Sequence, residues 1–213
     1  MNASDGGFMN TITVIGAARD WNPTLSLDFG KRPRKMSEDE FFMFCQANRD
    51  LRIERNKNGD IEIIAPTGIE GGARNFILNA EFGVWVEKDG TGVGLDSSTG
   101  LTLPNGAVRS PDFAWLSREK WNAIPGADRK RFAHVCPDFV VELRSETDTL
   151  KKLQAKMEEY IENGVSLEWL IDPLERKVHI YRPDTEIEIL DNPAKLYGKP
   201  LLKGLVINIQ KVW

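Results

Sequence analysis

The segment from Phe139 to Ile171 restricts the fold of this chain more than any other part of the sequence. The run Phe139-Val140-Val141-Glu142-Leu143 has the composition of a strand that is buried on both faces. An amphipathic helix is predicted over residues 147–163, with an apolar stripe of Leu150, Leu153, Met157, Tyr160 and Ile161 and a stop at Asn163-Gly164. Residues 167–171 then form a second strand, so the order predicts a right-handed crossover within one sheet.

The region before this crossover predicts a helix and a β-hairpin. Ser37-Glu38-Asp39-Glu40 is a capping-box pattern, so a short helix is expected to follow it. Residues 52–55 and 60–64 read as two strands around Asn58-Gly59, a pair that accepts the positive φ angles of a tight turn. The sequence therefore predicts an antiparallel pair near the start of the fold.

A second helix and several further strands are predicted on either side of the crossover. A helix of about four turns begins near Glu70, and its apolar face is expected to pack on the sheet through Phe76, Ile77, Ala80, Val84 and Trp85. Residues 93–95, 101–103 and 108–116 predict a β meander, and residues 178–181 predict another strand. Residues 187–190 and 205–209 are expected to be edge strands.

The length of 213 residues suits one domain with a substantial core. Residues 1–30 lack a sustained hydrophobic period, so they predict a poorly ordered or loosely packed arm ahead of a single domain over residues 31–213. No apolar run approaches the roughly 20 residues that span a bilayer, which argues against an integral membrane protein. Cys45 and Cys136 form no metal or disulfide framework, and with no recognisable signal peptide we expect a cytoplasmic protein.

The net charge of −4 does not indicate an extensive surface for nucleic acid. Any such role depends on local charge. Basic residues cluster at 31–35, 129–131 and 151–152, and each cluster is either a local contact surface or solvated surface charge.

Two acidic residues stand in strand-like apolar surroundings. One of them is the Asp of a Pro-Asp pair, and the other follows such a pair. Asp112 belongs to Ser110-Pro111-Asp112 and Glu142 to the run that opens with Pro137-Asp138. A carboxylate among apolar side chains needs a cation or a hydrogen-bonded partner, and two acids on neighbouring strands repel each other. A Mg²⁺ ion would remove both penalties. The alternative is structural: Asp112 caps a turn after Pro111, and Glu142 pairs with Arg144.

The order of motifs along the chain resembles the Uma-type family of restriction endonucleases. The motifs that carry this resemblance span roughly residues 37–183 and include Pro66-Thr67-Gly68, Arg109-Ser110-Pro111-Asp112, Cys136 to Ser145, Leu153 to Met157 and Trp169 to Pro173. The series in fixed order is more specific than any single motif.

The resemblance implies the restriction-endonuclease-like PD-(D/E)XK fold, an α/β (α+β) fold with a central mixed sheet flanked by helices. It also implies hydrolysis of phosphodiester bonds with Mg²⁺, for which Mn²⁺ is a substitute. By the resemblance, Asp112 and Glu142 are metal ligands and Glu70 is the additional acid of the site. The other reading of Glu70 is an exposed acid at a helix start, where the helix dipole favours it.

The chain departs from the superfamily pattern at the lysine. Arg144 stands two residues after Glu142, and a guanidinium that stays protonated can stabilise charge on a phosphate but is a poor base. Lys156 borders the apolar stripe of the following helix and can replace the missing ammonium, as the family resemblance also implies. Alternatively, Lys156 is a surface lysine paired with Glu159 or Glu162.

These observations favour a Mg²⁺-dependent endonuclease that acts on DNA, in which Lys156 and Arg144 stabilise charge on the phosphate. A homodimer would let two sites cut both strands of a duplex. Two alternatives stay open: an inactive nuclease relative that binds nucleic acid as a regulator, and a protein-interaction scaffold. His134 and His179 lack neighbouring ligands in the sequence, so neither is expected to be catalytic, and His179 is expected to face outward from a strand.

Overall fold

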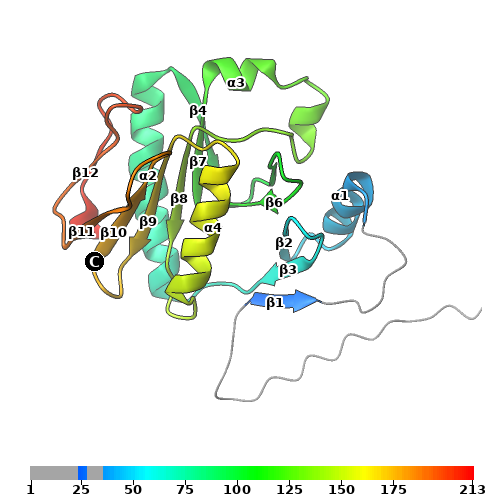
Figure 1. Cartoon of the computed structure of the whole chain (residues 1–213), viewed down its shortest axis with the longest axis horizontal. Helices are drawn as coiled ribbons and strands as arrows, with labels where there is room; N and C mark the ends of the chain where they lie inside the picture. Colours follow the sequence, from blue (N-terminus) through cyan, green and yellow to red (C-terminus); the bar gives the residue numbers. More distant parts are fainter. Residues whose placement is uncertain (1–23, 28–35) are drawn as a thin grey trace, which may run out of the picture.

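The fold consists of a large mixed sheet between two helices, with a smaller antiparallel sheet beside it (Figure 1). A computed structural model describes the backbone of residues 24–27 and the whole of residues 36–213. Most of the predicted N-terminal arm and the basic cluster at 31–35 lie outside the described residues. Within the arm, β1 (Thr24–Leu27) pairs with the smaller sheet.

The large sheet has six strands, and its centre is the crossover that the sequence predicted. Its spatial order is β11 (Glu188–Asp191), β10 (Lys177–Tyr181), β9 (Leu167–Asp172), β8 (Phe139–Leu143), β7 (Phe113–Ser117) and β4 (Gly92–Asp96). β8 and β9 are parallel and are joined by helix α4 (Leu150–Glu162), whereas the other neighbours are antiparallel. The strand–helix–strand prediction is therefore confirmed, as is the edge strand near residues 187–190.

Helices α2 (Ile69–Asp89) and α4 cover opposite faces of the large sheet (Figure 1). Phe139 and Val141 of β8 belong to the core cluster under α2, while Val140 belongs to the cluster under α4. Because side chains alternate along a strand, Glu142 also lies on the α4 face. The alternation of β8 thus assigns its one acid to the side of the sheet that α4 covers.

Helix α2 is longer than predicted and packs through a different stripe. It has 21 residues and buries Leu78, Phe82 and Trp85, with the Phe82 ring stacked on Phe113 at 4.3 Å between centroids. Phe76 and Val84 are instead 75% and 55% exposed, and Ala80 is exposed as well, so the predicted apolar face is wrong for these three residues. Apolar residues occur around much of this helix, and periodicity alone did not determine which stripe meets the sheet.

The smaller sheet carries the predicted hairpin. It has the order β1, β3 (Ile61–Ile64), β2 (Arg52–Arg55), β6 (Val108–Arg109) and β5 (Leu101–Thr102). Gly59 has a φ of 90° at the tip of the β2–β3 turn, as expected for an Asn-Gly hairpin. Helix α1 (Glu38–Ala47) begins with the predicted capping box at Ser37 and packs on this sheet through Phe41.

The predicted β meander is wrong, because its strands divide between the two sheets. β4 pairs directly with β7 in the large sheet, whereas β5 and β6 pair in the smaller one. The predicted continuous strand over residues 108–116 is interrupted at residues 110–112, where Pro111 has no amide hydrogen for a sheet ladder. Asp112 therefore lies where the chain passes from the smaller sheet into the large one.

The remaining elements lie at the ends of this framework. Helix α3 (Arg118–Ala123) and a 3₁₀ turn (Asp128–Lys130) follow β7, and a two-stranded sheet of β12 (Leu196–Tyr197) and β13 (Val206–Ile207) precedes a 3₁₀ turn (Ile209–Lys211). The strand expected over residues 205–209 is thus shorter than predicted and pairs with β12. None of the helices that the structure describes has both the length and the apolar character to cross a membrane.

Candidate active site

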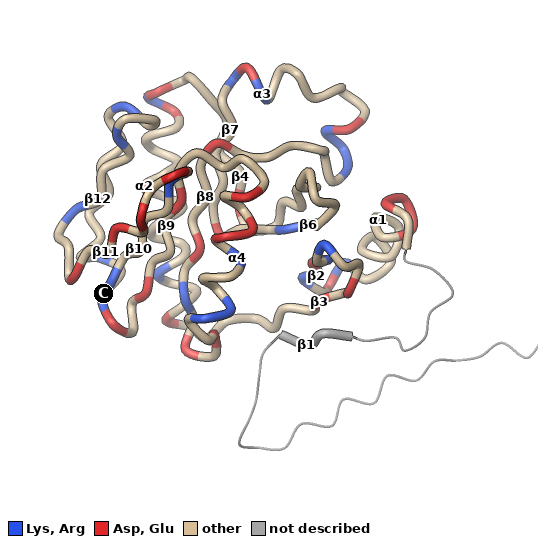
Figure 2. Tube along the Cα trace, in the orientation of Figure 1, with Lys and Arg blue, Asp and Glu red and all other residues tan. Residues whose placement is uncertain are grey.

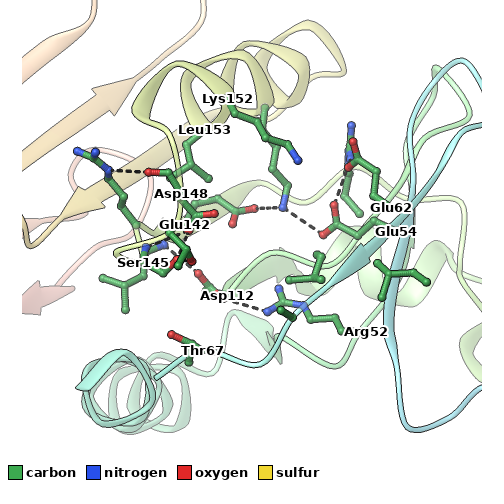
Figure 3. A pocket seen from close by; sticks show the side chains of 18 of the residues that line it. Arg52, Glu54, Glu62, Thr67, Asp112, Glu142, Ser145, Asp148, Lys152 and Leu153 are labelled. Atoms are coloured by element: carbon green, nitrogen blue, oxygen red, sulfur yellow. Dashed lines mark hydrogen bonds and ion pairs between the residues drawn. The ribbon is translucent and has the colours of Figure 1, made fainter. Parts of the chain in front are cut away.

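A cleft of about 820 Å³ opens between the hairpin of the smaller sheet and helix α4. Its walls come from β2, β3, the start of α2, the carboxyl end of β8 and one face of α4. Figure 3 shows Asp112 lying between Glu142 and Arg52 in this cleft, with Glu54 and Glu62 on the hairpin side. The cleft therefore contains Asp112 and Glu142, which lie 30 positions apart in the sequence.

Asp112 and Glu142 are placed side by side by the register of two strands. Phe113 of β7 is opposite Val141 of β8, so one step further Asp112 comes opposite Glu142. The Asp112 carboxylate accepts a hydrogen bond of 2.9 Å from the Leu143 amide, and the Asp112 carbonyl accepts one of 3.2 Å from the Asn79 side chain. The Asp112 side chain is therefore held against the end of β8, where it faces the cleft.

Lys156 reaches both walls of the cleft from α4. Its Nζ lies 2.8 Å from Glu142 Oε1 and 3.1 Å from Glu54 Oε1, and its side chain is only 14% exposed. The alternative pairing of Lys156 with Glu159 or Glu162 at the surface is wrong. Burial alone would lower the pKa of Lys156, but the two carboxylates raise it above its ordinary value, so the ammonium stays charged.

Glu54 is the acid of this cleft that sequence reasoning missed. It is buried in β2, where Oε1 accepts from the Ser110 amide at 3.0 Å and Oε2 from Arg109 at 3.1 Å. Burial by itself would raise the pKa of Glu54, but Lys156, Arg109 and the Ser110 amide lower it to about 2. One signal was present: the hairpin register places Glu54 opposite Glu62, and two like charges in that position require a cation.

Arg109 is that cation, and it joins the hairpin to α4. Its guanidinium lies 3.1 Å from Glu54, 2.8 Å from Glu62 and 2.7 Å from Glu159. Burial would lower the pKa of Arg109, but these carboxylates raise it well above its ordinary value. Arg109 therefore links the hairpin wall of the cleft, through Glu54 and Glu62, to the α4 wall, through Glu159.

The Glu142 carboxyl has a strongly raised pKa. Burial is the largest cause, the nearby acids Asp112 and Glu54 add to it, and Lys156 opposes them, which leaves the pKa at about 7. The Tyr160 hydroxyl donates a hydrogen bond of 3.0 Å to Glu142 Oε1. Glu142 Oε1 therefore has two partners, Tyr160 and Lys156, while the negative charge of the carboxylate is only partly compensated.

Glu70 and Arg144 do not join the central acids. The Glu70 side chain is 71% exposed and pairs with Arg74 at 3.3 Å, so the structure supports its reading as an exposed acid at a helix start rather than as a neighbour of Asp112. Arg144 lies 2.6 Å from the buried Asp172, so it pairs neither with Glu142 nor with the central acids. Residues two apart in a strand lie on the same face, so Arg144 is expected beside Glu142. The Arg144 guanidinium is directed instead towards Asp172 of β9.

The histidines and cysteines lie away from the central acids. His134 is exposed and lies 2.7 Å from Glu38. His179 is buried on β10, so the prediction that it faces outward is wrong, and burial lowers its pKa. Cys45 and Cys136 are half-buried, and burial raises the pKa of each thiol to about 11.

The oxygen atoms at the centre of the cleft fit a hard divalent cation. Among residues 36–213, no group of three or more His, Cys, Asp or Glu side chains is arranged to hold a metal ion. Within the same residues, Glu142 Oε2 has no hydrogen bond and Asp112 Oδ1 has only a 3.5 Å contact with Arg52. The network contains more carboxylates than cations, namely Glu54, Glu62, Asp112, Glu142 and Glu159 against Arg52, Arg109 and Lys156. Mg²⁺ suits such a site because it binds few carboxylates and keeps waters or phosphate oxygens.

Comparisons with known proteins agree with the fold. The Uma2 family model, described as "Putative restriction endonuclease", matches residues 38–210. Among solved structures, the chain is similar to a putative nuclease belonging to DUF820 from Anabaena variabilis, with a TM-score of 0.64 and 21% identity over 83% of this chain and 97% of that one. A search of curated proteins finds no match. The solved structure supports the nuclease fold.

Proposed function

Because the chain belongs to the Uma2 family, we propose that it is a Mg²⁺-dependent endonuclease that hydrolyses phosphodiester bonds of DNA. Family and fold support nuclease function. The observation that carries the finer proposal is the arrangement at the end of β8: Asp112 and Glu142 lie opposite each other, and Lys156 contacts Glu142. Two acids that can hold a metal ion and an ammonium that can stabilise charge on a phosphate suit hydrolysis of a phosphodiester.

In this proposal Asp112 and Glu142 hold the metal through the oxygens that face the cleft. A bound Mg²⁺ lowers the pKa of water and polarises the phosphate. Glu54 holds the Lys156 ammonium between the two walls, from where it can donate to a phosphate oxygen or orient the attacking water. Arg144 is paired with Asp172, so the proposal assigns charge stabilisation to Lys156 rather than to Arg144.

The reaction conserves its atoms and protons. The water oxygen forms a new bond to phosphorus, and the bond from phosphorus to the 3′ oxygen breaks. Water gives up one proton and the leaving oxygen takes one up, so the products are a 5′-phosphate and a 3′-hydroxyl. The charge that builds on the phosphate oxygens is the part that Lys156 stabilises.

Two exposed lysines on the cleft walls are placed to contact a polyanionic substrate, although the exposed acids Asp50, Glu158 and Glu162 line the cleft as well. Lys57 belongs to the hairpin wall and Lys152 to the α4 wall, and both line the cleft. Figure 2 shows Lys and Arg interspersed with Asp and Glu along the described trace, without one long basic stretch. DNA contact is accordingly proposed for the cleft itself. A homodimer and a cytoplasmic location stay predictions.

A cleavage assay tests the proposed function. The wild type should degrade plasmid and linear DNA with Mg²⁺ or Mn²⁺ and should be inactive in EDTA, because the acids alone supply no positive charge to the phosphate. Asp112→Asn should reduce the rate at least about 10³-fold, since it removes a charged ligand. Asp128→Asn, on an exposed 3₁₀ turn, is the matched control. Equal activity of wild type and Asp112→Asn, after removal of contaminating nuclease, would contradict the proposal.

Metal affinity should depend on pH through Glu142. Its pKa is about 7, raised chiefly by burial, and the metal binds the deprotonated form. Affinity for Mn²⁺ should therefore fall about tenfold per pH unit below 7 and level off above 7, which calorimetric titrations between pH 5.5 and 8.5 measure. A constant affinity between pH 5.5 and 7.5 would mean that Glu142 is not a ligand.

A further inference from the structure

Among the described residues, Arg52 is a cation beside Asp112 whose guanidinium donors are only partly used. Of the cationic side chains that line the cleft, Arg109 has three carboxylate partners, Lys156 has two, and Arg144 is paired with Asp172. Lys57 and Lys152 are exposed at the walls. Arg52 thus combines a place beside Asp112 with spare hydrogen-bonding capacity on the hairpin side of the cleft, opposite Lys156 on α4.

The contacts of Arg52 show which donors remain. Nη2 donates to the Ser110 carbonyl, which fixes the side chain to the chain segment just before Asp112. Nη1 reaches Asp112 Oδ1 only at 3.5 Å, and Nε is buried with no hydrogen-bond partner among the described residues. The long Nη1 contact therefore leaves a guanidinium donor next to Asp112 for the oxygen of a ligand in the cleft.

The position of Arg52 agrees with a ligand at the centre of the cleft. Its side chain is 32% exposed, and Figure 3 shows it extending from the hairpin towards Asp112. The oxygen that it approaches, Asp112 Oδ1, is the one available to the proposed metal. A phosphate bound next to that metal would bring an anionic oxygen within reach of the guanidinium.

We propose that Arg52 is a catalytic residue that donates hydrogen bonds to a non-bridging oxygen of the scissile phosphate. This inference rests on the proposed function and deepens it. A planar guanidinium with several donors binds a phosphate well, and it holds its charge where negative charge builds up in the transition state. Lys156 and Arg52 then contact the phosphate from α4 and from the hairpin respectively.

The test compares Arg52→Gln and Arg52→Lys with the control Arg49→Gln, an exposed arginine that does not line the cleft. Arg52→Gln should lower kcat by about 10²–10³-fold, as for the loss of one transition-state donor, and Arg52→Lys should lower it about tenfold. Added guanidinium ion should restore part of the activity of Arg52→Gln, but none of that of Asp112→Asn. Unfolding midpoints of all variants are measured alongside.

Mn²⁺ titration separates this role from an orienting one. If Arg52 binds the phosphate, Arg52→Gln should bind Mn²⁺ at least as tightly as the wild type, because a cation next to Asp112 has been removed. Weaker Mn²⁺ binding, together with no rescue by guanidinium, would overturn the proposal and make Arg52 a positioning residue for Asp112. An Arg52→Gln rate within threefold of the Arg49→Gln rate would overturn it as well.

A binding measurement keeps the inference distinct from the proposed function. If the wild type cleaves no DNA, the proposed activity fails, and Arg52 is judged by affinity for the dinucleotide pTpT in the presence of Ca²⁺. At least tenfold weaker binding by Arg52→Gln than by Arg49→Gln would support a phosphate contact. Equal binding would refute it.

Discussion

Replacing Glu142 by Gln should abolish cleavage and at the same time stabilise the metal-free protein at pH 8. The loss of a charged ligand should reduce the cleavage rate at least about 10³-fold. The gain in stability follows from the pKa of Glu142, which is about 7 in the folded protein against 4.5 for an ordinary Glu, chiefly because the group is buried. Both effects come from the same buried charge.

The sign of the stability effect changes with pH. Between pH 4.5 and 7 the folded state binds more protons than the unfolded state, so the wild type loses stability as pH rises through this range. Glu142→Gln lacks this loss and should be more stable by about 2 kcal/mol at pH 8, with little difference near pH 4.5. Denaturant titrations in EDTA at the two pH values measure it, and Mg²⁺ should stabilise only the wild type.

Glu119→Gln is the matched control for this experiment, because Glu119 is exposed on α3 and does not line the cleft. It should change neither cleavage nor stability appreciably. A Glu142→Gln protein that is less stable than the wild type at both pH values would show that the carboxylate mainly serves as a structural partner of Lys156.

Replacing Lys156 by Met should have the opposite effect on stability. The ammonium lies within 3.1 Å of both Glu54 and Glu142, and its loss leaves two buried carboxylates facing each other. Breaking a buried ion pair in this way costs about 3–5 kcal/mol. Cleavage should also fall by about 10²–10³-fold, because a positioned cation no longer faces the phosphate.

A double-mutant cycle assigns the cause of this destabilisation. Lys156→Met combined with Glu142→Gln should recover part of the lost stability, because one of the two unpaired charges is gone. Lys151→Met, on an exposed position of the same helix outside the cleft lining, is the control and should be nearly neutral. If the two substitutions are instead additive, Lys156 and Glu142 do not interact in the folded protein.

Local patterns in the sequence predicted the crossover, the hairpin and the capping box. Each depends on residues within about 30 positions of one another: the apolar run at 139–143, the stripe of α4, the Asn58-Gly59 turn and Ser37 with Glu40. Such features express backbone preference and hydrophobic period, which act over short distances along the chain. The sequence also singled out Asp112, Glu142 and Lys156, because acids in apolar strands and a lysine beside an apolar stripe are locally unusual.

Other features were decided by contacts between distant segments. The sheet under α2 selected Leu78, Phe82 and Trp85 over Phe76 and Val84. The predicted meander does not form, because β6 belongs to the smaller sheet and β7 to the large one. In each case several local arrangements had similar energies, and tertiary packing chose among them.

By itself, the sequence predicted the central crossover and singled out two acids, Asp112 and Glu142, in apolar strand-like surroundings. Only the tertiary structure decided that Glu54 and Arg52 complete the cleft, while Glu70 and Arg144 lie outside its centre with Arg74 and Asp172 as partners. The physical reason is that a charged side chain is directed by the nearest compensating charge. That charge comes from segments more than 50 residues away for Glu54 and Arg52, and no local pattern identifies it.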